Sequence, residues 1–363
     1  MEKMVSNLGT GFLQAGYKVD FLLIKARGAH LQHLPQGARI IDLKSWSSAT
    51  SLFALLRYLR RERPAALLAA KDRAGRTALL ARRLAGIPEK VVLRLGMNLS
   101  QSLQSKTRLQ RALRYYPARW LYPWADGIIC VSKGVAEDIA AITRLPVSRM
   151  RVVANPVITP DIYQLAAQEP GQEWPSIPDA PRIIAIGRLT RQKGFDVLLQ
   201  AFARLSSICQ CRLLILGEGP QRPQLERQIK ELQLQELVRL PGFEPNPYAC
   251  LARAELCVLS SRFEGSPNVL AEALALGVPV VATDCRSGPG QILDEGRFGT
   301  LVPVDDARAL ARAMAEVLKS PPDRSVLPRA VQDYTLENST RAYLQEMGLQ
   351  SRINTDSLKE TGC

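Results

Sequence analysis

The stretch FEGSPNVLAEALALG, residues 263–277, carries start and stop signals for one helix. Ser266 is of the residue type that caps a helix start, and Pro267 suits the first helical position because its missing N–H would have no partner there. Gly277 suits the residue after the last turn, where the backbone becomes left-handed. The pattern predicts a helix of about three turns.

The same stretch sets two carboxylates on either side of the helix start. Glu264 lies just before the helix, where backbone N–H groups and the positive end of the helix dipole make an anion site. Glu272 lies inside the helix, where its oxygens can accept hydrogen bonds from sugar hydroxyls. The arrangement favours a nucleotide sugar as the ligand. The alternative is an ordinary Pro-initiated helix whose two glutamates share no role.

A second segment, IGRLTRQKG at 186–194, places two cations in a loop after an expected strand. Gly187 permits close approach of a ligand to the backbone, while Arg188 offers a rigid fork of donors and Lys193 a mobile point charge. Together the two cations can hold a diphosphate and neutralise its charge as it leaves. Solvated loop cations are the alternative interpretation of the pair.

Two further glycine-containing turns follow expected strands. Gly217 lies in LGEGP at 216–220 and Gly288 in SGPG at 287–290, and each is a candidate contact for phosphate or sugar. Neither turn matches GxGxxG or GxxxxGK(S/T) where a strand meets a helix, so dehydrogenases and P-loop enzymes are disfavoured.

Short apolar runs alternate with helical patterns along the chain, which is typical of parallel sheets flanked by helices. Strands are expected in the first half at 19–24, 39–43, 65–70, 90–95, 127–131 and 151–153. In the second half they are expected at 182–186, 212–216, 255–259, 278–282 and 300–302, with helices at 194–205, 221–234, 267–276 and 307–318. The sequence predicts an α/β protein of two doubly wound domains facing a cleft, with ligands at the carboxyl ends of the strands.

A segment rich in proline and without a clear period sets the domain boundaries. We expect an N-terminal Rossmann-like domain at 1–158, a linker at 159–181, and a C-terminal Rossmann-like, nucleotide-sugar-binding domain at 182–330. A C-terminal helix is expected at 331–349 and a flexible tail at 350–363.

Composition narrows the class of protein. No run approaches the roughly 18 apolar residues of a spanning helix, and the chain start lacks the apolar region of a secretory signal, so we expect a cytoplasmic or peripheral protein. Seven scattered cysteines and two histidines, His30 and His33, show no metal-ligand spacing. We therefore expect reduced core thiols and no metal.

The net charge of +14 is unevenly distributed. Residues 1–160 hold 26 Lys+Arg against 9 Asp+Glu, a net +17, whereas residues 161–363 hold 22 against 25, a net −3. A basic half suits an anionic membrane surface or a nucleic acid, and a basic surface that serves only solubility is the alternative. Cations and aromatic rings mix at 106–124, which suits a membrane interface, although a buried aromatic cluster fits equally. No nucleic-acid recognition motif is present, so no nucleic acid is expected.

The order of these motifs resembles the family 4 retaining glycosyltransferases (glycosyl transferases group 1) of the GT-B fold. The resemblance rests on GRLTRQKGFDVLLQAFA at 187–203, LGEGP at 216–220 and EGSPNVLAEALALGVPVVATD at 264–284, with DGIICVS at 126–132 and VANP at 153–156. It implies that Arg188 and Lys193 bind the donor diphosphate, that Glu272 binds the ribose, and that Glu264 faces the transferred sugar. It implies further donor contacts from Gly187, Gly217, Gly265, Ser266, Asn268, Val269 and Gly288.

The resemblance also implies a metal-independent transfer with retention of configuration, in which the leaving phosphate helps to remove the acceptor proton. Charge neutralisation by Arg188, Lys193 and the helix-start amides is then the main catalytic effect. The resemblance implies a UDP-linked sugar as donor and a glycan or lipid-linked acceptor, bound by the N-terminal domain at 1–158, in cell-surface polysaccharide or lipopolysaccharide synthesis. No cofactor is implied, and the expected place of action is the cytoplasm, including the inner face of the membrane.

The chain departs from the family pattern at two places. Many relatives place a histidine after the strand equivalent to 91–95, where this chain continues Arg94-Leu95-Gly96-Met97-Asn98, so the role of that histidine has no carrier. Relatives also open with an apolar strand and a Gly-Gly loop, whereas this chain opens with a helical pattern at 1–15, so the first strand of the N-terminal domain is expected to be missing from the chain as given. These departures keep two alternatives open: a catalytically impaired binding protein of the same fold, and a nucleotide-sugar epimerase or hydrolase.

Overall fold

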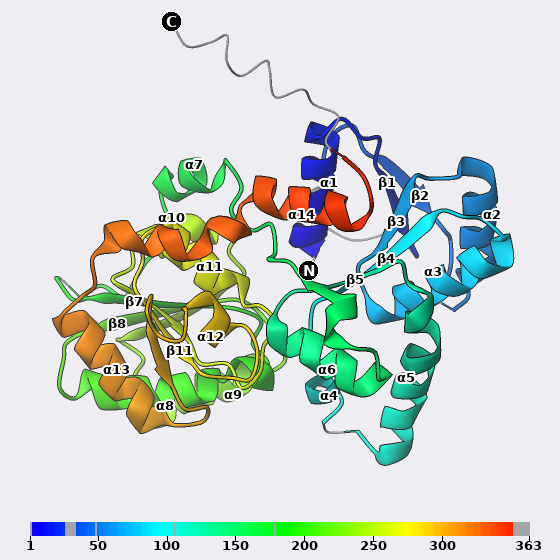
Figure 1. Cartoon of the computed structure of the whole chain (residues 1–363). Helices are drawn as coiled ribbons and strands as arrows, with labels where there is room; N and C mark the ends of the chain where they lie inside the picture. The colour runs from blue at the N-terminus through cyan, green and yellow to red at the C-terminus, as the bar shows by residue number, and fades with distance from the viewer. Residues whose placement is uncertain (1, 26–33, 48, 105, 178, 351–363) are drawn as a thin grey trace, which may run out of the picture. The chain divides into compact units, whose positions relative to one another are not determined.

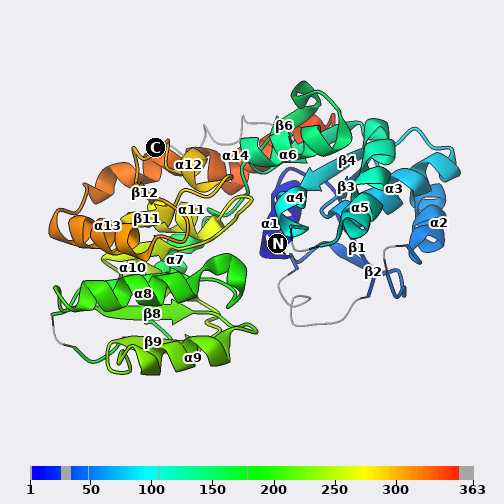
Figure 2. The same ribbon diagram turned by 90° about the horizontal axis from the view of Figure 1, so that it is seen from below.

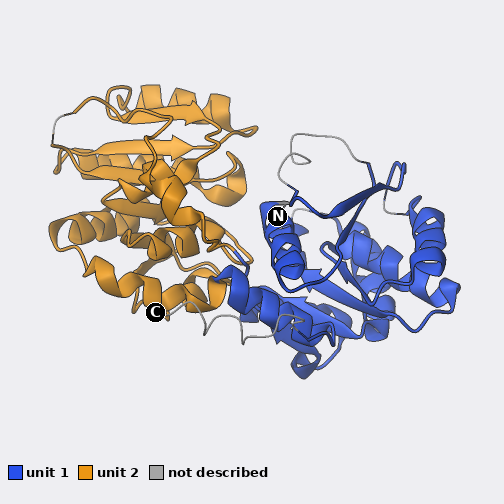
Figure 3. Ribbon diagram, turned by 90° about the horizontal axis from the view of Figure 1, so that it is seen from above, with its two compact units in different colours: residues 1–156, 335–363 blue, residues 157–334 orange. Residues whose placement is uncertain are grey.

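The computed structural model describes residues 2–25, 34–47, 49–104, 106–177 and 179–350, and the chain divides into two compact units. Unit 1 comprises residues 1–156 and 335–363, and unit 2 comprises residues 157–334 (Figure 3). The segment 159–181, assigned to a linker from the sequence, lies in unit 2 and contains helix α7 (Ile162–Ala167). Of the tail expected at 350–363, all but the first residue lies outside the described residues.

The strands of unit 2 form one parallel sheet in the order β12-β11-β10-β7-β8-β9 (Figure 1). Their bounds are β7 (Arg182–Ile186), β8 (Arg212–Leu216), β9 (Val238–Gly242), β10 (Leu256–Leu259), β11 (Val280–Thr283) and β12 (Thr300–Val302). The chain runs from β7 outward through β8 to β9, and then returns to place β10 on the other side of β7. The strand order therefore reverses between β7 and β10, and ligands of open α/β sheets bind at such a switch point, beyond the carboxyl ends of the strands.

Helices cover both faces of this sheet. Helices α8 (Phe195–Ser206), α9 (Arg222–Glu231) and α13 (Ala307–Lys319) pack on one face, and α10 (Pro247–Ala252) and α11 (Asn268–Ala275) lie on the other (Figure 1). Helix α8 packs on the sheet because its apolar residues repeat at helical spacing and so share one face. The residues of this face that are buried in the core are Phe195, Leu198, Leu199, Phe202 and Leu205. The short helix α12 (Pro289–Ile292) follows β11, and a 3₁₀ segment at Arg324–Tyr334 closes the unit.

The described strands of unit 1 form two parallel sheets. The first pairs β1 (Asp20–Leu23) with β2 (Arg39–Asp42), and the second has the order β3-β4-β5-β6. The bounds of the second sheet are β3 (Ala66–Ala69), β4 (Lys90–Leu95), β5 (Gly127–Cys130) and β6 (Met150–Val152). Figure 2 shows β1 and β2 separated from β3 and β4 within this unit.

Two hydrophobic clusters flank the four-stranded sheet. One lies under α2 (Leu52–Glu62), α3 (Asp72–Ala85) and α6 (Lys133–Thr143), and the other under α1 (Glu2–Gln14) and α14 (Leu336–Glu346). Helix α4 (Leu99–Ser102) and helix α5 (Arg108–Leu121), followed by a 3₁₀ turn at Tyr122–Trp124, complete the unit. The last helix begins five residues later than the 331–349 range expected from the sequence, because Thr335 caps it by accepting from the N–H of Asn338.

Every strand expected from the sequence is present, with ends that differ by at most two residues. Strand β9 was not expected. It contains Pro241 in the segment VRLPG, and Pro is disfavoured within strands except at a sheet edge, which is where β9 lies.

Candidate functional site

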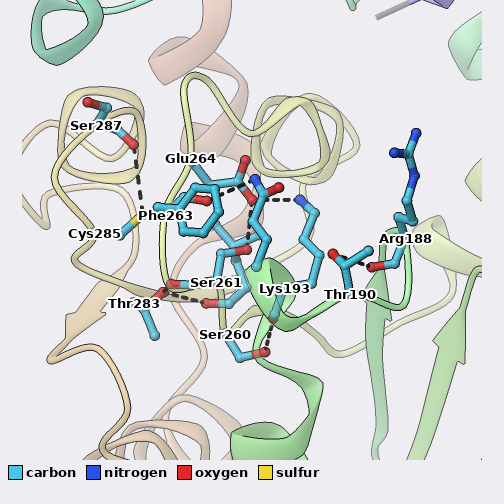
Figure 4. Close-up of polar contacts among 12 residues, drawn as sticks. Arg188, Thr190, Lys193, Ser260, Ser261, Phe263, Glu264, Thr283, Cys285 and Ser287 are labelled. Carbon is cyan, nitrogen blue, oxygen red and sulfur yellow. Dashed lines mark hydrogen bonds and ion pairs between the residues drawn. The ribbon is translucent and has the colours of Figure 1, made fainter. Parts of the chain in front are cut away.

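Two loops meet at the switch point of the unit 2 sheet. The loop after β7 spans residues 187–194, and the loop after β10 spans residues 260–267. Their closest polar contact joins Lys193 Nζ to Glu264 Oε1 at 2.6 Å, with both side chains largely shielded from solvent at 17% and 8% exposure (Figure 4). Two sequence-predicted site residues from different loops are thus brought together.

Hydrogen bonds between main chain and side chains fix the two loops against each other. Gln192 Nε2 donates to the Phe263 carbonyl at 2.9 Å, and the Arg262 N–H donates to the Gln192 carbonyl at 2.7 Å. Ser260 Oγ donates to the Lys193 carbonyl at 2.9 Å. The loops therefore present Lys193 and Glu264 on a prearranged frame.

Gly194 explains how closely the loops approach. Its φ is +63°, a left-handed conformation that favours glycine, and a Cβ at this position would lie 2.1 Å from the Ser260 carbonyl oxygen. Any larger residue would push the two loops apart.

An ion pair between Arg262 and Asp196 also holds the loop after β10 in place. Arg262 donates to both oxygens of Asp196, at 2.9 and 2.7 Å, and so links the β10 loop to the first turn of α8. Burial raises the pKa of the Asp196 carboxyl, but the Arg262 guanidinium, together with the backbone N–H groups of Asp196 and Val197, holds that pKa below its usual value. The bidentate geometry adds orientation as well as energy.

Glu264 is buried, at 6% exposure, yet it is satisfied as a carboxylate. Besides Lys193, the Ser261 hydroxyl donates to it at 2.7 Å, and both donors reach Oε1. Among the described residues, no hydrogen-bond donor contacts Oε2. A buried carboxylate held in one orientation is suited to accept a hydrogen bond from a ligand hydroxyl.

Arg188, the second cation of the first loop, is exposed and extends away from the Lys193–Glu264 pair (Figure 4). No carboxylate of the described residues forms an ion pair with it. Both cations were expected at one diphosphate, and the structure places them apart on the same loop (Figure 4). Gly187 leaves room for the Lys193 stem, since a Cβ there would lie 3.1 Å from Lys193 Cε.

Two predicted glycines have a structural reason in close packing between loops. Gly217 has φ +146°, and a Cβ there would lie 2.0 Å from the Gly187 carbonyl oxygen. Gly288 has φ +92°, and its Cβ would lie 2.5 Å from Pro267 Cδ. Both residues thus bring the loops after β8 and β11 against those after β7 and β10.

The start of α11 corrects one sequence expectation. The helix covers Asn268–Ala275, its cap position is Pro267, and no side chain caps it, so the expected cap by Ser266 is wrong. The helix begins one residue later than predicted, which leaves Ser266 outside the cap position, and at eight residues it is also shorter than the predicted three turns. Gly265 and Val269 are buried beside this start, and Gly277 takes the predicted left-handed conformation at the end, with φ +68°.

Glu272 lies on α11 and is held by a residue that the sequence analysis missed. The Tyr248 hydroxyl, from α10, donates to Glu272 Oε1 at 3.0 Å. Burial raises the pKa of Tyr248 far above its usual value and the Glu272 carboxylate raises it further, so the phenol stays a donor. No spacing signal links residues 248 and 272, and only the packing of α10 against α11 brings them together.

Neither a metal cluster nor a membrane-spanning helix is found in the described part of the chain. Among the described residues, no three His, Cys, Asp or Glu side chains could hold one metal ion. Within the same residues, no helix has both the length and the apolar character needed to cross a membrane. The described cysteines are unpaired and mostly buried, whereas Cys363 and the two histidines lie outside the described residues.

Two family models match the chain. The model of a glycosyl transferase 4-like domain matches residues 1–156, and that of glycosyl transferases group 1 matches residues 180–320. Among curated proteins, an N-acetylgalactosamine-N,N'-diacetylbacillosaminyl-diphospho-undecaprenol 4-alpha-N-acetylgalactosaminyltransferase of Campylobacter jejuni is 36% identical over 199 residues, which cover 55% of this chain and 52% of that protein. The lipopolysaccharide core biosynthesis glycosyltransferase LpsE of Rhizobium meliloti is 31% identical over 236 residues, 63% of this chain and 66% of LpsE. The match leaves a third to a half of each relative uncovered.

Solved structures share the fold over nearly the whole chain. The lipopolysaccharide outer core galactosyltransferase WaaB in its apo form aligns with a TM-score of 0.72 at 18% identity, covering 96% of this chain and 95% of that chain. Anabaena HepE in complex with UDP and glucose aligns with a TM-score of 0.75 at 17% identity, covering 94% and 95%. At such identities the likeness shows the fold alone, which is GT-B, as predicted. With both of its halves matched by models of this family, the chain belongs to the group 1 glycosyltransferases of the GT-B fold.

Proposed function

We propose that this chain is a metal-independent, retaining glycosyltransferase that uses a UDP-linked sugar as donor. In this proposal the acceptor is a glycan or lipid-linked glycan in the synthesis of cell-surface polysaccharide or lipopolysaccharide. The observation that carries the proposal is the Lys193–Glu264 pair, held at the switch point of the unit 2 sheet beside the start of α11. The names of the two relatives support it, since they describe sugar transfer to a diphospho-undecaprenol-linked acceptor and lipopolysaccharide core synthesis.

The proposed roles follow from where each side chain lies. Lys193 and the exposed Arg188 neutralise the donor diphosphate, assisted by the positive end of the dipole at the start of α11. Glu272 accepts the ribose hydroxyls, oriented by Tyr248. Glu264 accepts a hydroxyl of the transferred sugar at Oε2, because both of its recorded donors occupy Oε1.

The chemistry asked of the protein is charge stabilisation. In a front-side transfer the acceptor oxygen bonds to the anomeric carbon on the side from which the diphosphate leaves, and the leaving phosphate oxygen receives the acceptor proton. Negative charge develops on the diphosphate, and cations already held in place stabilise it without reorganisation. The hydrogen bonds that fix the 187–194 and 260–267 loops provide that preorganisation.

We also infer that the enzyme acts at the cytoplasmic face of a membrane. A carrier such as diphospho-undecaprenol, named for the Campylobacter relative, is a lipid, and the first half of this chain carries a net +17. An anionic membrane surface attracts such a domain.

The test is a transfer assay with the full chain, a panel of nucleotide sugars and lipid-linked acceptors. We expect a product whose anomeric configuration matches the donor and a rate that EDTA does not change. Arg188→Ala is expected to lose roughly 2–4 kcal/mol of transition-state stabilisation, that is, about 30- to 900-fold in kcat/KM. Arg191→Ala, at an exposed position in the same loop, is the matched control and should be unaffected.

Three results would contradict the proposal. Unchanged turnover in Arg188→Ala would remove the diphosphate role. Donor binding without transfer to any acceptor would favour a binding protein of the same fold. An inverted product would exclude the retaining mechanism.

A further inference from the structure

We propose that unit 1 docks on an anionic lipid surface through the outer face of α5. Four large apolar side chains of this helix are exposed: Leu109 at 71%, Leu113 at 65%, Tyr116 at 61% and Trp120 at 71%. We call these four residues the α5 stripe. The inference names the membrane-contacting surface, and it does not depend on the transfer chemistry, because lipid binding is measured without a donor.

The four residues share one face of the helix. Their spacing of four, three and four residues keeps them within an arc of about 60° at 100° per residue. The inner face carries Ala118, which is fully buried. An apolar stripe on the outer face is the reverse of what a solvated surface helix shows, so this face is suited to an apolar partner.

The helix is formed before any partner arrives. Thr107 accepts from the Gln110 N–H and the Gln110 side chain accepts from the Thr107 N–H, which completes a capping box. Such a box stabilises the helix start, so docking need not supply the ordering of the chain.

The charge beside the stripe has one sign. Helix α5 contains four arginines and no acidic residue. Arg108 and Arg119 lie about a quarter turn to one side of the stripe, whereas Arg111 donates to two main-chain carbonyls and Arg114 lies 3.7 Å from Asp72. Two arginines therefore remain to pair with phosphates at the edge of the stripe.

Neighbouring helices extend the same character. Figure 1 shows α2, α3 and α5 on one side of unit 1. Phe53 of α2 is 76% exposed and Leu84 of α3 is 56% exposed. Two surface hollows on these helices each combine arginines with an aromatic ring. One is lined by Phe53, Leu56, Arg57, Arg60 and Arg61. The other includes Arg82, Arg83 and Trp124, and the Arg83 guanidinium lies 4.6 Å from the centre of the Trp124 ring.

A lipid surface fits this combination better than a protein groove. Trp and Tyr side chains favour the headgroup level of a bilayer, Leu side chains reach the acyl boundary, and arginines pair with anionic headgroups. The α5 stripe lies on the outer, convex face of a helix, and such a face can contact a flat lipid surface. Its single-sign charge matches a surface that is anionic throughout.

The experiment is co-sedimentation of the full chain with vesicles, at low and high salt. Vesicles of equal phosphatidylglycerol and phosphatidylcholine should bind the chain at low salt, and pure phosphatidylcholine should bind it weakly. Leu113→Ser/Trp120→Ser is expected to lower the partition coefficient at least about tenfold, because withdrawing even one of these two large apolar side chains from the bilayer has that effect. Arg108→Gln/Arg119→Gln should lower it about fivefold per arginine and weaken the salt dependence.

The matched control replaces equally exposed apolar residues of unit 2. Ile208→Ser/Tyr163→Ser removes side chains that are 76% and 53% exposed, and it should leave vesicle binding unchanged. Transfer to a soluble acceptor should stay at the wild-type rate in the stripe variant, which separates a failure of this inference from a failure of the proposed enzyme activity. The inference is overturned if the wild-type chain ignores anionic vesicles, or if the stripe variant binds them equally. It is also overturned if the stripe variant changes only self-association, which would make the stripe a contact between copies.

Discussion

Replacing Lys193 with alanine tests the frame on which the proposed site is built. The substitution removes the ammonium that contacts Glu264 Oε1 at 2.6 Å and leaves a carboxylate that is 6% exposed with Ser261 as its recorded donor. A buried charge that loses its partner costs free energy even when its remaining hydrogen bond is kept.

The magnitude follows from the burial of the pair. Removing one member of a fully buried ion pair costs about 3–5 kcal/mol. The Lys193 side chain keeps 17% exposure, so water screens part of the interaction, and we expect a loss of about 2 kcal/mol in the local stability of unit 2. Adding Glu264→Gln removes the stranded charge, so the double variant should lose about 1 kcal/mol less than the sum of the two single variants.

Hydrogen exchange of the backbone amides of β10, Leu256–Leu259, measures the local opening free energy of unit 2. It does not require the assumption that both units unfold in a single transition. Lys230→Ala, on the exposed face of α9 in the same unit, is the control and should change the opening free energy by less than about 0.5 kcal/mol. If Lys193→Ala exchanges like the wild type, or if the two substitutions are additive, the pair does not hold the loops and the reasoning is refuted.

Three further predictions concern the packing around the site. Gly194→Ala should destabilise unit 2 by at least about 2 kcal/mol, because the added Cβ would meet the Ser260 carbonyl. Gly86 has a similar φ of +65° but lies in open space, so Gly86→Ala should cost about 1 kcal/mol. Equal losses in urea unfolding would contradict the close contact between Gly194 and Ser260. Tyr248→Phe should lower the UDP association constant about 2- to 12-fold while leaving pyrophosphate binding unchanged, as calorimetry would show, since it removes one hydrogen bond to the proposed ribose ligand. Burial raises the pKa of Cys130, Cys257 and Cys285 to about 12. Iodoacetamide at pH 8 should therefore modify the native chain at Cys209 and spare these three thiols until urea is added. Modification of any of the three before urea is added would show that its thiol is accessible in the folded protein. Because burial keeps these thiols protonated in the fold, the free energy of unfolding should not change with their titration below the ordinary thiol pKa of 9.0. It should fall as the pH rises from 9.0 towards 12, as urea unfolding followed by circular dichroism would record.

The sequence carried most of the sheet architecture because its strands are short apolar runs bounded by glycine and proline. The motifs after β7 and β10 were placed correctly at strand ends, and the switch point between those strands then brings Lys193 and Glu264 together. The pairing itself was not predictable, since 71 residues separate the two and only the strand order makes their loops neighbours.

Other features were beyond local patterns for the same reason. The contact of Tyr248 with Glu272 depends on how α10 packs against α11, and the approach of Gly194 to Ser260 depends on loop geometry. The mixed segment at 106–124 allowed both a membrane face and a buried aromatic cluster. The structure divides it: Tyr122 is fully buried with its hydroxyl bonded to Asp72, whereas Trp120 is 71% exposed.

The central claim is that the loops after β7 and β10 form the binding site for a donor diphosphate. Calorimetric titration of the full chain with UDP and with uridine tests it most directly, because the two ligands differ only in the diphosphate. We expect UDP to bind at least about 30-fold more tightly than uridine, the effect of two charge-assisted contacts of about 1 kcal/mol or more each. In Arg188→Ala/Lys193→Ala that preference should fall about 30-fold, while the affinity for uridine stays the same. Equal affinities in the wild-type chain, or an unchanged preference for UDP in the double variant, would contradict the account.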